Sequence, residues 1–116
     1  MKSFKELIVW QKSRLLVQSI YELTSQLPNE ERFGLVSQAR RSSVSIPSNI
    51  AEGYRRKGRK EYVHFLAIAA GSAAELETQL ILIQDIFKIG ADTELNSLLE
   101  VQKMLSSLIN KLDPKH

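Results

Sequence analysis

The residues of this sequence best suited to chemistry form a basic cluster in the middle of the chain. Five of the six residues from 55 to 60 are cations: Arg55, Arg56, Lys57, Arg59 and Lys60. The segment 40–60 holds seven of the 16 lysines and arginines and one of the 13 acids. It therefore carries +6, which leaves −3 for the rest of a chain whose net charge is +3. A basic segment on an otherwise acidic chain favours an anionic partner.

We predict that these five side chains contact the phosphates of RNA or DNA, with Arg41 in a supporting role, because arginine forks match phosphate oxygens. Contacts of this kind carry no sequence specificity. Tyr54 and Tyr62 flank the cluster and would suit unpaired bases, but both also fall on apolar helical stripes, which favours burial. The alternative for the cations is that they only keep a helix end solvated.

Residue patterns for catalysis or metal binding are sparse. The sequence contains no cysteine, no G-x-S-x-G motif and no glycine loop of the Walker or dinucleotide type. A di-iron centre in a helical bundle needs two Glu-x-x-His motifs, whereas this chain has one, Glu61 to His64, and its other histidine is the terminal His116. We therefore expect a protein that is not an enzyme and holds no metal or cofactor.

One carboxylate falls between two apolar stripes of a predicted helix. This residue, Glu77, is expected to be at least half buried, and a buried carboxylate needs a partner. Arg40 lies on the flank of the preceding helix, so we predict a structural ion pair between Arg40 and Glu77.

The elements that carry these residues are predicted to be four helices. Apolar residues recur at helical spacing over about 4–27, 30–57, 59–88 and 92–113. Asn29 is a candidate cap for the second segment, and Asp92 or Thr93 for the fourth. Short connections between amphipathic helices predict an all-α fold, an up-down-up-down antiparallel four-helix bundle. The length of 116 residues fits a single domain spanning 1–116.

The second segment contains Pro47, yet its apolar stripe continues in phase across the proline. We predict one continuous helix kinked at Pro47, with nearby serine hydroxyls supplying local hydrogen bonds. A helix that ends at Ile46 and restarts at Pro47 is the alternative.

The third segment is apolar around most of its circumference. One small bundle covers only part of such a helix, so we expect a homo-oligomer. The absence of cysteine suits a reducing compartment, the N-terminus does not resemble a secretory signal, and no segment approaches about 20 consecutive apolar residues. We therefore expect a cytoplasmic location and no membrane contact.

The sequence resembles the 23S rRNA-intervening sequence protein family of bacterial four-helix-bundle proteins. The resemblance is carried by QARR at 38–41, SIPSNIAEG at 45–53, GS at 71–72 and ELETQL at 75–80, with WQKS at 10–13 and IYELT at 20–24 in the first helix. It implies a ring-like homopentamer, encoded in rRNA intervening sequences or elsewhere in genomes, with no established enzymatic activity. The family is similar in fold to accessory proteins of diversity-generating retroelements, basic pentamers that bind nucleic acid and a reverse transcriptase. Gly58 stands where many relatives have a hydroxyl cap, which implies a more flexible turn.

Two functions thus remain open from the sequence. The first is a homo-oligomeric bundle that binds nucleic acid through the turn between the second and third helices. The second is a protein–protein interaction scaffold with no role in nucleic-acid binding, in which the cations only make the turn soluble.

Overall fold

The computed structural model describes residues 3–115, and within this range the chain forms four α-helices, two short 3-10 helices and no strand. The elements are η1 (Phe4–Glu6), α1 (Ile8–Thr24), η2 (Asn29–Glu31), α2 (Leu35–Arg55), α3 (Arg59–Phe87) and α4 (Asp92–Leu112). The all-α four-helix fold predicted from apolar periodicity is confirmed.

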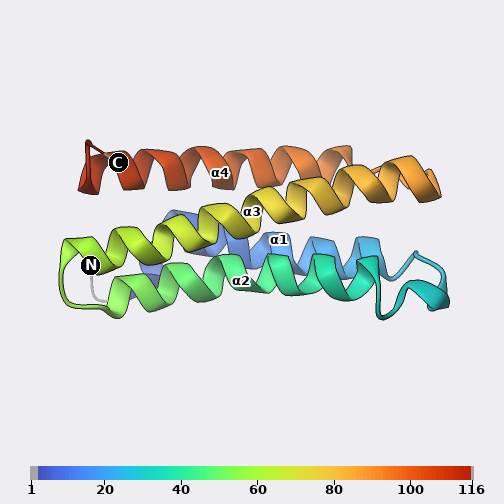
Figure 1. The fold of residues 1–116 in the computed structure, drawn as a ribbon, viewed down its shortest axis with the longest axis horizontal. Helices are drawn as coiled ribbons and strands as arrows, with labels where there is room; N and C mark the ends of the chain where they lie inside the picture. Colours follow the sequence, from blue (N-terminus) through green and yellow to red (C-terminus); the bar gives the residue numbers. More distant parts are fainter. Residues whose placement is uncertain (1–2, 116) are drawn as a thin grey trace.

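The helices lie side by side along the long axis of the molecule. In Figure 1 the α1–α2 and α3–α4 connections lie at one end, and the α2–α3 turn lies at the other end with the start of α1 and the end of α4. Contacts join α1 to α2, α2 to α3, α3 to α4 and α4 to α1, and the α2–α3 contact is the most extensive. The basic turn therefore joins the two helices with the most extensive contact and lies at the same end of the bundle as the start of α1 and the end of α4.

A single apolar core runs between the helices. Its largest fully buried side chains are Leu16, Ile20, Ile46, Ile50, Leu66, Leu76, Leu80, Ile83, Leu98, Val101 and Leu105. Ser13, which fills a gap in the stripe of α1, is buried and donates its hydroxyl hydrogen to the Trp10 carbonyl oxygen at 2.9 Å. Apolar residues at helical spacing in each of the four segments thus supply the buried face of each helix.

Two predicted helix starts and the predicted caps differ from the structure. The first segment begins as η1 and becomes α-helical only at Ile8. The second helix begins at Leu35 rather than near Glu30, and the Glu31 carboxylate accepts a hydrogen bond from the Leu35 N–H at 3.2 Å. Neither Asn29 nor Asp92 caps a helix: η2 and α4 have no side-chain cap, and Asp92 accepts a hydrogen bond from the Gln84 amide instead.

α2 runs without interruption through Pro47, so the alternative of a helix that restarts at the proline is wrong. Neighbouring polar side chains bond to the backbone of the surrounding turns, as predicted. The Ser48 hydroxyl donates to the Val44 carbonyl oxygen at 2.8 Å, and the Asn49 amide donates to the Ser45 carbonyl oxygen at 2.8 Å. The Ser45 hydroxyl also lies 2.8 Å from that of Ser72, which ties this part of α2 to α3. A bend at Pro47 stays a prediction.

Pro47→Ala is expected to preserve the fold. The alanine restores a backbone N–H for the Ser43 carbonyl oxygen and improves helix propensity, while the rest of α2 is already held against α1 and α3. Circular dichroism should show unchanged helix content, and Tm should stay equal or rise by a few degrees. A loss of helix content, or a clearly lower Tm, would contradict this account of the proline.

α3 has the length and apolar composition of a helix that could cross a membrane, which corrects the expectation that no segment approaches this threshold. The core helix of a bundle meets the same criterion. In this chain, 44% of the apolar window is buried inside the structure, in contact with α2 and α4.

Candidate nucleic-acid interface

The basic turn is short because its two helices nearly abut. α2 ends at Arg55 and α3 begins at Arg59, and the Arg56 N–H donates to the Gly53 carbonyl oxygen at 3.1 Å. Gly58 has φ 102° and ψ 146°, a conformation that side chains other than glycine rarely adopt. The cations therefore lie on the ends of two helices and on the short, constrained connection between them, rather than on a long loop.

Close approach of α2 and α3 underlies the turn. Gly53 is buried, and a Cβ atom at this position would lie 2.9 Å from the Phe65 Cβ and 3.1 Å from the Tyr62 carbonyl oxygen. The rings of Tyr54 and Tyr62 meet edge to face, with their centroids 6.1 Å apart. Burial, and secondarily the neighbouring Tyr54, raises the pKa of Tyr62. The two tyrosines contact each other beside the turn, which favours a packing role for them over stacking on unpaired bases.

Two of the five cations make contacts within the protein. The Arg55 guanidinium lies 5.5 Å from the centroid of the Phe4 ring. The Arg56 guanidinium lies 4.9 Å from the Phe65 ring centroid, and its Nε lies 3.1 Å from a carboxylate oxygen of Glu52. These contacts restrain both arginines, and Glu52 offsets part of their charge.

The other three cations, Lys57, Arg59 and Lys60, are exposed and make no hydrogen bond or ion pair with another residue that the structure describes. Their charged groups are available to phosphates without first breaking an internal contact. They form the accessible centre of the predicted interface.

Arg41 does not join this group. It is exposed on α2, 14 residues before Arg55, which corresponds to roughly 21 Å along the helix axis. Within one chain, its supporting role would therefore require a ligand that extends along α2.

The predicted ion pair between Arg40 and Glu77 does not form in the structure. The Arg40 Nε donates to the Thr24 hydroxyl oxygen at 2.9 Å, and its guanidinium lies 4.3 Å from the Tyr21 ring centroid, so Arg40 faces α1. Glu77 is exposed, contrary to prediction, and accepts a hydrogen bond from the Gln102 amide of α4 at 3.0 Å. The periodicity of a single helix does not determine how that helix is rotated about its axis in the bundle. Because neighbouring positions on α3 face different partners, a small error in this rotation assigns Glu77 to the wrong helix.

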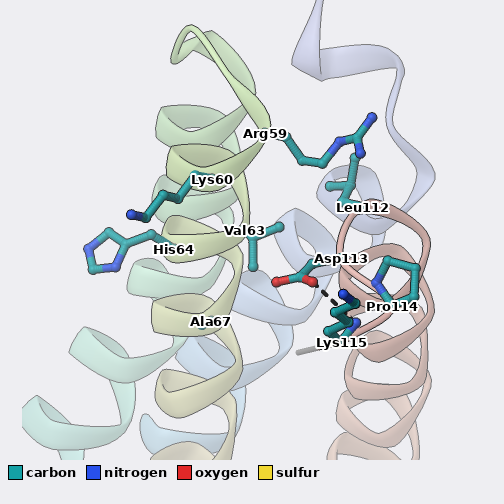
Figure 2. Close-up of a pocket in the computed structure, with 9 residues that line it drawn as sticks. All are labelled: Arg59, Lys60, Val63, His64, Ala67, Leu112, Asp113, Pro114 and Lys115. Atoms are coloured by element: carbon teal, nitrogen blue, oxygen red, sulfur yellow. Dashed lines mark hydrogen bonds between the residues drawn. The ribbon is translucent and has the colours of Figure 1, made fainter.

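The structure adds residues that sequence reasoning missed. A groove of about 600 Å³ lies beside the basic turn, between the first turns of α3 and the end of α4 (Figure 2). It is lined by Arg59, Lys60, Val63, His64, Ala67, Leu112, Asp113, Pro114 and Lys115. The up-down-up-down order predicted from the sequence could have indicated this groove, since such an order places the end of the fourth helix next to the start of the third.

Metal-binding geometry is absent from the part of the chain that the structure describes: no group of three or more histidine, aspartate or glutamate side chains is placed to hold an ion. Glu61 and His64 are exposed on the first turns of α3. His116 lies outside the described residues.

The sequence matches the family model described as 23S rRNA-intervening sequence protein over residues 5–111. The chain belongs to this family. Its structure is also similar to the crystal structure of a protein of unknown function from the S23 ribosomal protein family of Bacteroides thetaiotaomicron. That protein is 31% identical, with a TM-score of 0.81 over 88% of this chain and 98% of the other. No curated protein matches the sequence. The resemblance drawn from the SIPSNIAEG segment is thus confirmed.

Proposed function

We propose that this member of the 23S rRNA-intervening sequence protein family is a non-enzymatic homo-oligomer that binds RNA or DNA through the α2–α3 turn. The phosphate contacts are assigned to Arg55, Arg56, Lys57, Arg59 and Lys60. The family name relates its members to rRNA genes, and the charge distribution of this chain is consistent with a polyanionic partner.

The observation that carries the proposal is the concentration of exposed cations at one end of the bundle. All five side chains are exposed, and Glu52 is the one acid that forms an ion pair with them among the described residues. Phosphate binding by such a surface depends on counterion release and needs no base recognition.

Binding of structured rRNA, single-stranded RNA and duplex DNA, each measured against salt concentration, tests this proposal. We expect retention of at least one probe at low salt. The log–log dependence should be linear, with a slope of roughly −0.7 per neutralised phosphate on single strands and −0.9 on duplex DNA. Failure to retain all three probes at low salt would end the nucleic-acid proposal.

Self-association is supported by apolar side chains on the outer surface of α3. Ile68, Ile81, Leu82 and Ile86 are exposed in the single chain, with Ile86 57% exposed. Long apolar helices of this kind favour burial against another subunit, and the family resemblance suggests five copies. Each copy would repeat the basic turn around the symmetry axis, so that weak contacts add as avidity.

Light scattering at micromolar concentration should therefore give a mass several times 13.2 kDa, with a pentamer as the expected state. A monomeric mass would contradict both the interpretation of α3 and the pentamer suggested by the resemblance. The result does not depend on nucleic acid, which must be removed first by nuclease and high salt.

A protein-binding scaffold is the second candidate function. An apolar groove of about 460 Å³ lies between α1 and α2, lined among others by Phe4, Trp10, Val17, Val44 and Pro47. Under this alternative the protein keeps its oligomeric mass but binds none of the nucleic-acid probes.

A further inference from the structure

The groove beside the basic turn combines an apolar floor with a charged rim. Val63 is 5% exposed and Ala67 is half-buried, and with Leu112 these two side chains supply the aliphatic surface. Figure 2 shows Lys60 and His64 on one side of Val63, and Arg59 with the end of α4 on the other side. A volume of about 600 Å³ falls within the range of small-molecule sites, roughly 300–1,000 Å³.

The charges on the rim favour an anion. Arg59, Lys60 and Lys115 are exposed cations, and Asp113 is the one acid among the lining residues. One Asp113 carboxylate oxygen accepts a hydrogen bond from the Lys115 N–H at 3.2 Å, so this carboxylate already has a partner on its own side of the groove. The complementary ligand has an apolar flat body and negative charge on both sides of it.

A nucleotide within a single strand has this chemistry. Its base offers a flat apolar face, and the phosphates that flank it would reach Lys60 on one side and Arg59 or Lys115 on the other. His64 contributes an imidazole ring, which is one of the side chains on which unpaired bases stack. A duplex offers no free base of this kind.

We infer that the groove between α3 and the end of α4 receives an unpaired base of a single-stranded nucleic acid whose phosphates are held by the basic turn. The inference rests on the proposed function and extends it, because it specifies single strands over duplexes and adds Val63, Ala67, Leu112, His64 and Lys115 to the interface.

The test compares two strands of equal charge, an oligothymidylate of about ten nucleotides and an abasic deoxyribose–phosphate strand of the same length, by fluorescence anisotropy. Thymidylate should bind at least about fivefold more tightly, since each stacked base contributes a fivefold to hundredfold change in affinity. Equal affinity for the two strands would overturn the base site while leaving the proposed phosphate contacts intact. No binding of either strand would also overturn the base site, whereas the proposed function fails only if structured rRNA, single-stranded RNA and duplex DNA are not retained either.

Two variants locate the site. Ala67→Leu fills the groove with a good helix former, so thymidylate binding should fall to the abasic level while abasic binding stays unchanged. Ala70→Leu makes the same change on the next turn of α3. Because Ala70 is half-buried but does not line this groove, this control should keep the preference.

His64→Ala gives a second measurement with little effect on the core, because His64 is exposed and its ring contacts the ring of Phe65 only edge to face, with centroids 5.3 Å apart. The preference for thymidylate should decrease severalfold without a change in Tm or mass. If the preference survives in both Ala67→Leu and His64→Ala, the groove is not the base site.

Discussion

Replacing Arg55, Arg56, Lys57, Arg59 and Lys60 together with glutamine is expected to weaken nucleic-acid binding roughly 100-fold at low salt. Each lost phosphate contact removes about 0.7 from the log–log salt slope on single strands, so five contacts flatten it by up to about 3.5. The loss should be similar for different sequences, because phosphate contacts carry no base information. Anisotropy titrations over a range of salt concentrations measure both quantities.

The structure also indicates how the fold should respond to this variant. The ring contacts of Arg55 and Arg56 are worth on the order of 0.5–1 kcal/mol each at exposed sites, and the ion pair of Arg56 with Glu52 about 0.3–0.5 kcal/mol. Tm should therefore fall by a few degrees, and the oligomer mass should not change.

A smaller variant separates binding from these internal contacts. Lys57→Gln, Arg59→Gln and Lys60→Gln together remove three cations that have no partner among the described residues, so Tm should be unchanged while the salt slope flattens by up to about 2. Its control replaces Arg32, Lys88 and Lys103 with glutamine, since all three are exposed and lie away from the turn. Two of them make one local contact each, Arg32 with the Phe33 ring and Lys88 with the Asp85 carbonyl oxygen, so the Tm of this control is measured as well. If both triple variants lose affinity equally, net charge rather than the turn determines binding.

The fold was largely predictable from the sequence because burial follows the apolar stripes. Each helix has apolar residues at helical spacing, and the structure buries them fully. Examples, one from each helix, are Leu16, Ile46, Leu76 and Leu105. Helix starts were less predictable, since the cap of α2 comes from Glu31, a side chain outside the helix. A carboxylate that reaches forward to a backbone N–H leaves only a weak trace in a single sequence.

The candidate site was only partly predictable. The five cations are consecutive apart from Gly58, so any short turn keeps them together, whatever the packing. Arg40 faces α1 rather than Glu77, and Lys115 lines the groove beside the turn only because α4 ends beside the start of α3. Both outcomes depend on the rotation and register of separate helices, which periodicity within one helix does not determine.

The second large effect is expected at Gly53, where α2 and α3 approach each other closely at the base of the turn. In Gly53→Ala the added methyl would lie 2.9 Å from the Phe65 Cβ and 3.1 Å from the Tyr62 carbonyl oxygen. Both atoms are tied closely to the backbone of α3, so the helices must move apart. Overpacking of this kind lowers stability by about 1–3 kcal/mol, more than the roughly 0.5–1 kcal/mol that alanine contributes to a helix.

Thermal unfolding followed by circular dichroism should thus show a lower Tm for Gly53→Ala, by about 5 °C, and a larger decrease for Gly53→Leu. Gly71→Ala is the matched control, because Gly71 lies inside α3 and an added Cβ meets nothing within 4 Å. Its Tm should stay equal or rise, since alanine is the better helix former. A Gly53→Ala protein as stable as Gly71→Ala would show that α2 and α3 are not held in contact at this glycine. The turn would then lack the rigid base from which its cations are presented.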